Sequence, residues 1–241
     1  MPRCARIMLA GAAVHVIHRG NNRAPCFLSD EDRGFYLHHL GRNLARCGCL
    51  LHAYCLMDNH VHLLLTTAQA SGCALLMKSV AQLYARYFNK THRRTGYLWE
   101  GRFKSCLVQA EQYVLNCYRY IEMNPVRASV VRTAAEFPWS SFRANAYGEA
   151  SPLIAPHPEY QRLGRTRPEQ QAIYRDLFGT AAGAPLLEQI RRATNGGFVL
   201  GDPVYRNSVA RTLGRRVAPS TPGRRAGSKA EDGQAELAGW E

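Results

Sequence analysis

The sequence predicts an α+β fold in which strands and helices alternate, followed by a mostly helical basic extension. Hydrophobic residues alternate with histidines at 14–18, and an apolar run bounded by turn residues covers 60–66, as expected for strands. Between these segments, apolar residues recur at helical spacing in 74–89, which is typical of an amphipathic helix. The 241-residue chain is 46% hydrophobic, so a sizeable core is available.

The first four elements each carry a local signal. They are a strand, a helix and two strands that form a hairpin, at 14–18, 29–47, 51–57 and 60–66. Ser29 is followed by three acidic residues, so it reads as the N-cap of a helix with an acidic first turn. Asp58 and Asn59 supply turn chemistry between the two later strands.

The next elements lead to a tyrosine near the end of a helix. A helix, two short strand pieces and a second helix are predicted at 74–89, 97–99, 103–108 and 111–124. Pro125 disfavours helical geometry at Asn124, so the second helix should end there. Tyr120 and Asn124 are four residues apart, so both side chains can reach the same small volume.

The C-terminal part differs in composition. Two helices are predicted around 168–178 and 186–193, and 205–229 contains seven basic residues and no acidic one. Because a segment rich in Gly, Pro and Ser buries little apolar surface, we expect the tail to be disordered. The expected organisation is a domain, a helical accessory region and a basic tail, at 1–145, 146–204 and 205–241.

The charge of the chain indicates a polyanionic partner. Its 31 basic and 18 acidic residues give a net charge of +13, which favours nucleic acid first and an anionic membrane surface second. No apolar run approaches the roughly 20 residues needed to span a membrane. The basic N-terminus continues directly into the first strand, so we expect a cytoplasmic protein rather than one with a signal peptide.

The eight cysteines do not follow a metal-binding pattern. There is no Cys-x-x-Cys, and only Cys47 and Cys49 lie close together. The others are scattered through apolar segments, where a free cysteine behaves as a small hydrophobic residue. The sequence therefore predicts reduced core cysteines rather than structural zinc.

Two histidines and one tyrosine are the candidates for chemistry. Successive side chains of a strand point to opposite faces, so His60 and His62 share one face and could form half of a divalent-metal site. Together with Tyr120 as a nucleophile, on a basic chain, they point to phosphodiester chemistry on DNA. We read His15 and His18 as strand residues rather than ligands. Glu122 is read as a solvated or salt-bridged helix residue.

Several segments resemble the single-tyrosine HUH transposases that act on single-stranded DNA. More narrowly, the chain resembles REP-associated tyrosine transposases, relatives of small insertion-sequence transposases. The similarity covers roughly the first 145 residues and is carried by His18-Arg19-Gly20-Asn21-Asn22-Arg23, Met57-Asp58-Asn59-His60-Val61-His62-Leu63-Leu64, Gly96-Tyr97-Leu98-Trp99-Glu100-Gly101-Arg102-Phe103-Lys104-Ser105, Arg119-Tyr120-Ile121-Glu122-Met123-Asn124-Pro125-Val126-Arg127-Ala128 and Trp139-Ser140-Ser141.

The resemblance implies a ferredoxin-like core whose central antiparallel sheet carries the histidine pair. It implies cleavage of single-stranded DNA near short palindromic hairpins, with a 5′-phosphotyrosine intermediate and a free 3′-hydroxyl. Tyr120 would be the nucleophile, and His60 and His62 would bind magnesium or manganese. Asn124 stands where mobile relatives commonly place a glutamine, and is the expected third ligand.

The resemblance also implies a DNA interface and a location. The partner would be single-stranded DNA with palindromic hairpins, so the protein would be nucleoid-associated when bound. Trp99, with Arg102 and Lys104, either packs in the core or contacts the hairpin, and both monomer and homodimer remain open. The expected DNA-binding residues are Arg19, Asn21, Arg23, Arg102, Lys104, Arg119 and Arg127.

Two other classes of function remain open at this point. One is a metal-dependent hydrolase, because His-x-His also begins the zinc sites of barrel-type amidohydrolases. The absence of repeated strand–helix units in the pattern argues against it. The other is a noncatalytic protein that keeps the same fold to recognise hairpins, against which the intact His60, His62 and Tyr120 argue.

Overall fold

A five-stranded sheet forms the centre of the protein, and its strand order is β2-β3-β1-β4-β5. The computed structural model describes residues 5–179 and 183–219. The first four strands pair antiparallel, whereas β5 adds to β4 in parallel. The strands are β1 Ala13–Arg19, β2 Cys49–Met57, β3 His60–Thr67, β4 Lys104–Val108 and β5 Val199–Leu200. The α+β prediction with an antiparallel central sheet is confirmed, and the parallel β5 is an addition that the sequence did not predict.

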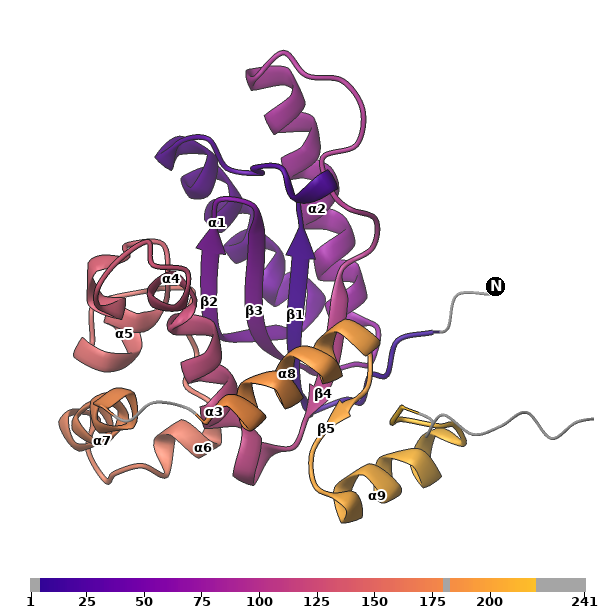
Figure 1. Ribbon diagram of the computed structural model, residues 1–241, viewed down its shortest axis with the longest axis vertical. Coiled ribbons are helices and arrows are strands. Elements are labelled where there is room, and N and C mark those ends of the chain that lie inside the picture. Colours follow the sequence, from indigo (N-terminus) through magenta and orange to yellow (C-terminus); the bar gives the residue numbers. More distant parts are fainter. Residues whose placement is uncertain (1–4, 180–182, 220–241) are drawn as a thin grey trace, which may run out of the picture.

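Helices cover both faces of this sheet. Helices α1 and α2 lie on one face, and α3 and α8 lie on the other (Figure 1). The helices are α1 Asp30–Leu44, α2 Gly72–Thr91, α3 Ala110–Glu122, α4 Asn124–Arg127, α5 Phe142–Tyr147, α6 Pro158–Gln161, α7 Arg167–Gly179, α8 Ala184–Gly196 and α9 Pro203–Leu213. Short 3-10 turns lie at Asn21–Arg23, Ala45–Cys47 and Ala134–Glu136.

The alternation of side chains along the strands separates the core into two layers. Val61 and Leu63 pack in the layer with α1 and α2, whereas Leu64 and Cys106 pack in the layer with α3 and α8. The interior strand β3 therefore presents one set of residues to each helical layer. The second layer contains Tyr120.

The helix that carries Tyr120 ends slightly earlier than the sequence predicts. Helix α3 ends at Glu122, and the short helix α4 then begins at Asn124. Pro125 lies within the first turn of α4, where its missing N–H would have no helical partner in any case. The proline therefore lies at the start of a second helix and does not mark the end of the first.

The expectation of a disordered tail from residue 205 is wrong for residues 205–219. Helix α9 begins at its N-cap Asp202, whose side chain accepts a hydrogen bond from the backbone N–H of Tyr205. Val209 and Val217 are 2% and 3% exposed and pack in the core layer that also contains Val199. These few apolar contacts order a segment whose composition is otherwise that of a tail. Residues 220–241 lie outside the described residues.

The cysteines agree with the prediction where they are described. Seven of them are free thiols, and six of these are buried. Within 5–179 and 183–219, no helix is both long and apolar enough to cross a membrane.

Candidate active site

The structure brings the histidine pair and the tyrosine together on one face of the sheet. The ring centroids of His60 and His62 are 4.9 Å apart, and that of Tyr120 lies 5.8 Å from His62. His62 is 2% exposed and Tyr120 is 6% exposed. Helix α3 packs over the face of β3 that carries the two imidazoles, so residues 58 or more positions apart in the chain share one small volume.

His60 is oriented by the residue that precedes it. Its Nδ1 lies 2.6 Å from the Oδ1 atom of Asn59, and the amide nitrogen of Asn59 donates to the backbone carbonyl of Arg23 at 3.1 Å. The second bond fixes which end of the amide faces the imidazole, so Nδ1 of His60 is the donor. The lone pair of Nε2 is then available for a metal ion.

His62 is oriented from the opposite side by His15. The Nδ1 atom of His62 lies 2.9 Å from Nε2 of His15, and Nδ1 of His15 lies 2.9 Å from the hydroxyl of Thr194. The two imidazole rings are nearly parallel, with an angle of 8° between their planes and centroids 5.2 Å apart. Thr194 belongs to α8, which begins 117 residues after the end of β3.

The surroundings keep all three imidazoles neutral. Burial, assisted by the charge of Arg19, lowers the pKa of His60 to about 4. Burial, assisted by the charge of Arg127, lowers the pKa of His15 to about 3. Burial also holds the pKa of His62 well below its usual range, with the neighbouring His60 and His15 as the next causes. A neutral imidazole is the form that binds a metal ion.

Arg127 lies against Tyr120. Its guanidinium carbon is 4.5 Å from the centroid of the phenol ring, and its Nη2 donates to the backbone carbonyl of Tyr120 at 2.5 Å. Burial first, and then the charges of Arg191 and Arg119, lower the pKa of Arg127. A positive charge is therefore held against the ring of the candidate nucleophile.

Asn124 lies beside the same backbone carbonyl. Its amide nitrogen donates to the carbonyl oxygen of Tyr120 at 3.4 Å, so its amide oxygen is the atom left for a ligand role. In the part of the chain that the structure describes, no group of three His, Cys, Asp or Glu side chains is arranged to hold a metal ion. A metal site here would therefore combine His60 and His62 with other oxygen ligands.

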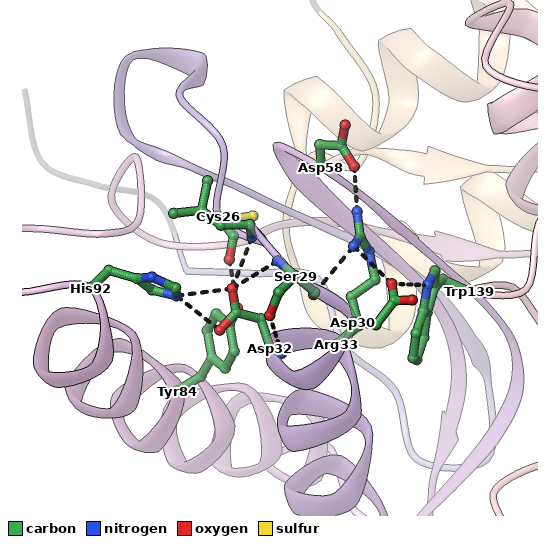
Figure 2. Close-up of polar contacts among 10 residues, drawn as sticks. Cys26, Ser29, Asp30, Asp32, Arg33, Asp58, Tyr84, His92 and Trp139 are labelled. Carbon is green, nitrogen blue, oxygen red and sulfur yellow. Dashed lines mark hydrogen bonds and ion pairs between the residues drawn. The ribbon is translucent and has the colours of Figure 1, made fainter.

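The turn before the histidine strand is held by a polar cluster, which Figure 2 shows. Arg33 bonds the carboxylate of Asp58 and lies 3.5 Å from that of Asp30, which also accepts a hydrogen bond from the indole of Trp139. The backbone carbonyl of Asp58 accepts from the N–H groups of Cys26 and Phe27, at 2.7 and 3.0 Å. The entry into β3 is thus fixed from several segments.

A second part of the same cluster holds the start of α1. Asp32 is fully buried and accepts from the backbone N–H groups of Leu28 and Ser29, at 2.8 and 3.2 Å. The Nε2 atom of His92 lies 3.0 Å from both of its oxygens. Ser29 caps the helix in return, as its position before three acidic residues predicts.

The expected DNA-binding residues are divided between two places. Arg19 pairs with His60 across β1 and β3, and Arg119 and Arg127 lie on the tyrosine side. Arg102 and Lys104 instead line a groove of about 680 Å³ beside β4. Asn21 and Arg23 belong to the loop that contacts the turn at Asn59.

Five basic residues line the groove beside β4. Arg6, Arg215 and Arg216 also line it, and no acidic residue does so among the residues described. Arg6 is held in place by the backbone carbonyl of Phe103 and by the phenyl ring of the same residue, whose centroid is 3.6 Å away. None of the five cations forms an ion pair with a described residue.

The reading of Glu122 as a solvated residue is wrong. It is fully buried, and its carboxylate accepts hydrogen bonds from Ser141, Asn145 and Tyr174, at 2.5, 2.8 and 2.6 Å. Burial raises the pKa of Glu122 to about 7, although the three donors act in the opposite direction. No local pattern distinguishes Glu122 from a solvated helix residue, because its three donors lie 19 or more residues away in the chain.

His15 and Thr194 are site residues that sequence reasoning missed. The alternation at 14–18 placed His15 on a strand, but did not indicate that strand β1 lies beside β3. The partner Thr194 is 179 residues away in the chain, and no local pattern marks it. Trp99 stacks on His18 with ring centroids 4.1 Å apart and donates to the carbonyl of Ala81, so its packing role is established.

Comparison with known proteins agrees with this geometry. Residues 9–124 match the model of a family described as "Transposase IS200 like". The matched segment contains His60, His62 and Tyr120 and ends at Asn124, whereas Thr194 lies beyond it.

A curated relative and a solved structure are also similar to this chain. A Haemophilus influenzae protein named "Putative REP-associated tyrosine transposase" is 29% identical over 111 residues, which cover 42% of this chain and 62% of that protein. The chain therefore matches less than two thirds of that relative's length. A structure described as a "REP associates tyrosine transposase bound to a REP hairpin" has a TM-score of 0.52 and 16% identity, and the match covers 65% of this chain and 93% of that one. This likeness shows the fold.

Proposed function

We propose that the protein is a DNA strand transferase that cleaves and rejoins single-stranded DNA near short hairpins through Tyr120. The convergence of His60, His62 and Tyr120 on one sheet face, within the segment that matches the IS200-like transposase family, carries this proposal. The REP hairpin bound in the similar solved structure supports a hairpin substrate.

The reaction is a transfer of a phosphodiester bond to the tyrosine. The Oη atom of Tyr120 attacks the phosphorus and loses its proton, while the bond from phosphorus to the 3′-oxygen breaks and that oxygen takes up a proton. The products are a 5′-phosphotyrosine and a free 3′-hydroxyl. Because the new bond is again a phosphodiester, another 3′-hydroxyl can reverse the step and rejoin the strand.

The residues around Tyr120 favour the attacking state. A phenol has an ordinary pKa of about 10, so it is a poor nucleophile at neutral pH. The guanidinium of Arg127 lies over the ring, where its charge would offset negative charge that develops at the phosphate in the transition state. The near-complete burial of Tyr120 holds its ring against His15 and His62, with ring centroids 5.6 and 5.8 Å away.

The donor set fits a divalent ion such as magnesium or manganese. When bound, the ion would supply positive charge that polarises the scissile phosphate. His60 and His62 would hold it through Nε2, since Nδ1 of each is engaged in a hydrogen bond, and the amide oxygen of Asn124 would be the third ligand. Imidazoles oriented by such partners on the second ring nitrogen are typical of metal ligands.

The basic groove suits the backbone of the DNA strand. Arginines and lysines that lack carboxylate partners attract phosphates. Arg102 and Lys104 would bind phosphates from the matched segment, and Arg215 and Arg216 would bind them from the C-terminal extension.

Covalent capture of DNA tests the proposed function. The probe is a pool of labelled single strands that carry a hairpin with randomised stem and flanks, incubated with manganese and resolved on a denaturing gel. We expect the full chain to form a protein–DNA adduct and Tyr120→Phe to form none while retaining hairpin binding. Tyr113→Phe, on the same helix, is the matched control and should form the adduct.

The same assay separates the other functions. An adduct in the Phe variant would make another tyrosine the nucleophile, and Tyr118 would be tested next. Hairpin binding by the wild-type chain without any adduct would show a noncatalytic binder. Cleavage without an adduct would indicate a metal-dependent hydrolase.

A further inference from the structure

A buried chain of hydrogen bonds leads from helix α8 to the histidine pair. The hydroxyl of Thr194 donates to the carbonyl of Ile190 at 2.8 Å, and it lies 2.9 Å from Nδ1 of His15. The Nε2 atom of His15 lies 2.9 Å from Nδ1 of His62. Thr194 and His15 are fully buried, and His62 is 2% exposed, so each group depends on the next one for its hydrogen bond.

The direction of this chain follows from the single proton of the hydroxyl. Because that proton is donated to Ile190, the oxygen of Thr194 accepts a proton from Nδ1 of His15. A neutral His15 then has an unprotonated Nε2, which accepts from Nδ1 of His62. His62 is left with an unprotonated Nε2.

We propose that Thr194 and His15 are positioning residues that hold His62 in the tautomer able to bind a divalent metal ion. The inference rests on the metal-assisted function proposed above and extends it to a helix outside residues 9–124. Thr194 touches neither the tyrosine nor the proposed metal position. It acts through His15 on the nitrogen atom that His62 offers.

Loss of the Thr194 hydroxyl would reverse the direction of the hydrogen bonds between His15 and His62. In Thr194→Val the side chain keeps its shape, but Nδ1–H of His15 has no acceptor in a buried place, which is costly. The other tautomer of His15 carries the proton on Nε2 and needs Nδ1 of His62 as its acceptor. The proton of His62 then moves to Nε2, where it blocks the metal ligand.

His60 provides an internal comparison. Its Nδ1 is bonded to Asn59, and this contact has no connection with Thr194 among the hydrogen bonds of the described residues. A change at position 194 should therefore alter the tautomers of His15 and His62 and leave that of His60 as it is. A general loss of structure would alter all three.

The test uses the full chain labelled with ¹⁵N-histidine, together with three variants. Thr194→Val removes the acceptor, and Thr194→Ser keeps a hydroxyl and should restore the wild-type behaviour. Thr212→Val is the matched control, because Thr212 lies in the extension and also donates to a carbonyl four residues earlier, at 3.1 Å. Nitrogen chemical shifts report the tautomers without metal, and the electron paramagnetic resonance of free Mn²⁺ reports manganese affinity.

We expect Nδ1–H tautomers for His15 and His62 in the wild type, in Thr194→Ser and in Thr212→Val. In Thr194→Val we expect both protons on Nε2 and manganese binding about tenfold to a hundredfold weaker, as for other lost partners of metal-bound histidines. Wild-type tautomers in Thr194→Val, or unchanged manganese affinity, would overturn the proposal.

A further variant separates this proposal from the proposed function. The combined change of His60→Ala and His62→Ala should abolish manganese binding at this site. If it does so while Thr194→Val binds as tightly as the wild type, the metal site stands and the positioning role is refuted. If the combined variant binds manganese as the wild type does, the proposed metal site is itself refuted, and the positioning role falls with it.

Discussion

Replacement of Glu122 by glutamine should make the protein more stable at neutral and alkaline pH. The carboxyl group is fully buried on the tyrosine helix, and burial raises its pKa from 4.5 to about 7. Glutamine has the same shape, and its amide can keep bonds to Ser141, Asn145 and Tyr174 because the two hydroxyls can rotate. The variant therefore isolates the effect of the charge.

The sign and size of the effect follow from proton linkage. Between pH 4.5 and about 7, the folded protein keeps a proton on Glu122 that the unfolded chain releases, so the free energy of unfolding falls as the pH rises. The stability that protonated Glu122 contributes relative to the ionised form is fully present below pH 4.5 and is lost as the pH rises through about 7. A pKa difference of one corresponds to about 1.4 kcal/mol, so a rise from 4.5 to about 7 gives about 3 kcal/mol.

Urea denaturation of both proteins from pH 5 to pH 8 measures this difference. The wild type and Glu122→Gln should be nearly equally stable at pH 5, and the variant should be about 3 kcal/mol more stable at pH 8. Glu111→Gln, at the exposed start of the same helix, controls for the loss of one negative charge. A Glu122→Gln variant that becomes less stable than the wild type as the pH rises would refute the reasoning, because the three donors would then outweigh burial.

Three further predictions concern the site and its supports. The combined change of His60→Ala and His62→Ala should remove metal-dependent cleavage and leave a cooperative melting transition in calorimetry, since no closed metal site holds the described fold together. Arg215→Ala with Arg216→Ala should weaken binding of single-stranded DNA and lower the log–log salt slope by up to about 1.4 for two phosphate contacts, measured by fluorescence anisotropy, with the cleavage position unchanged. Asp32→Ala leaves two backbone N–H groups without their acceptor and should cost about 3 kcal/mol in urea denaturation.

Local patterns were sufficient for most elements from β1 to α3. Examples are the cap Ser29 at the start of α1 and the turn at Asp58 in the hairpin. The strand piece predicted at 97–99 is wrong, because only Trp99 makes an isolated bridge, to Gly20. The period of two along β3 also placed His60 and His62 on one face, because that property depends on neighbouring residues only. Local patterns therefore predict the elements that a segment forms by itself and the faces of those elements.

The parts that the sequence missed depend on partners far away in the chain. Glu122 looks like an ordinary charged residue of a helix, and only the approach of Asn145 and Tyr174 makes it buried. The segment after residue 205 has the composition of a disordered tail, yet Val209 and Val217 are buried beside β5. Composition averages over a segment, whereas one or two well-placed apolar residues can order it.

The C-terminal extension is more closely tied to the site than its position in the sequence suggests. Helix α8 lies on the same face of the sheet as α3. Thr194 from this helix bonds His15, which in turn bonds His62. The extension also supplies Arg215 to the basic groove, where this side chain bonds the backbone carbonyl of Ala5. One extension therefore joins the orientation of the proposed metal ligands to the groove that would bind the strand. Changes in α8 should affect both metal affinity and DNA binding, whereas changes at Arg215 should affect DNA binding alone.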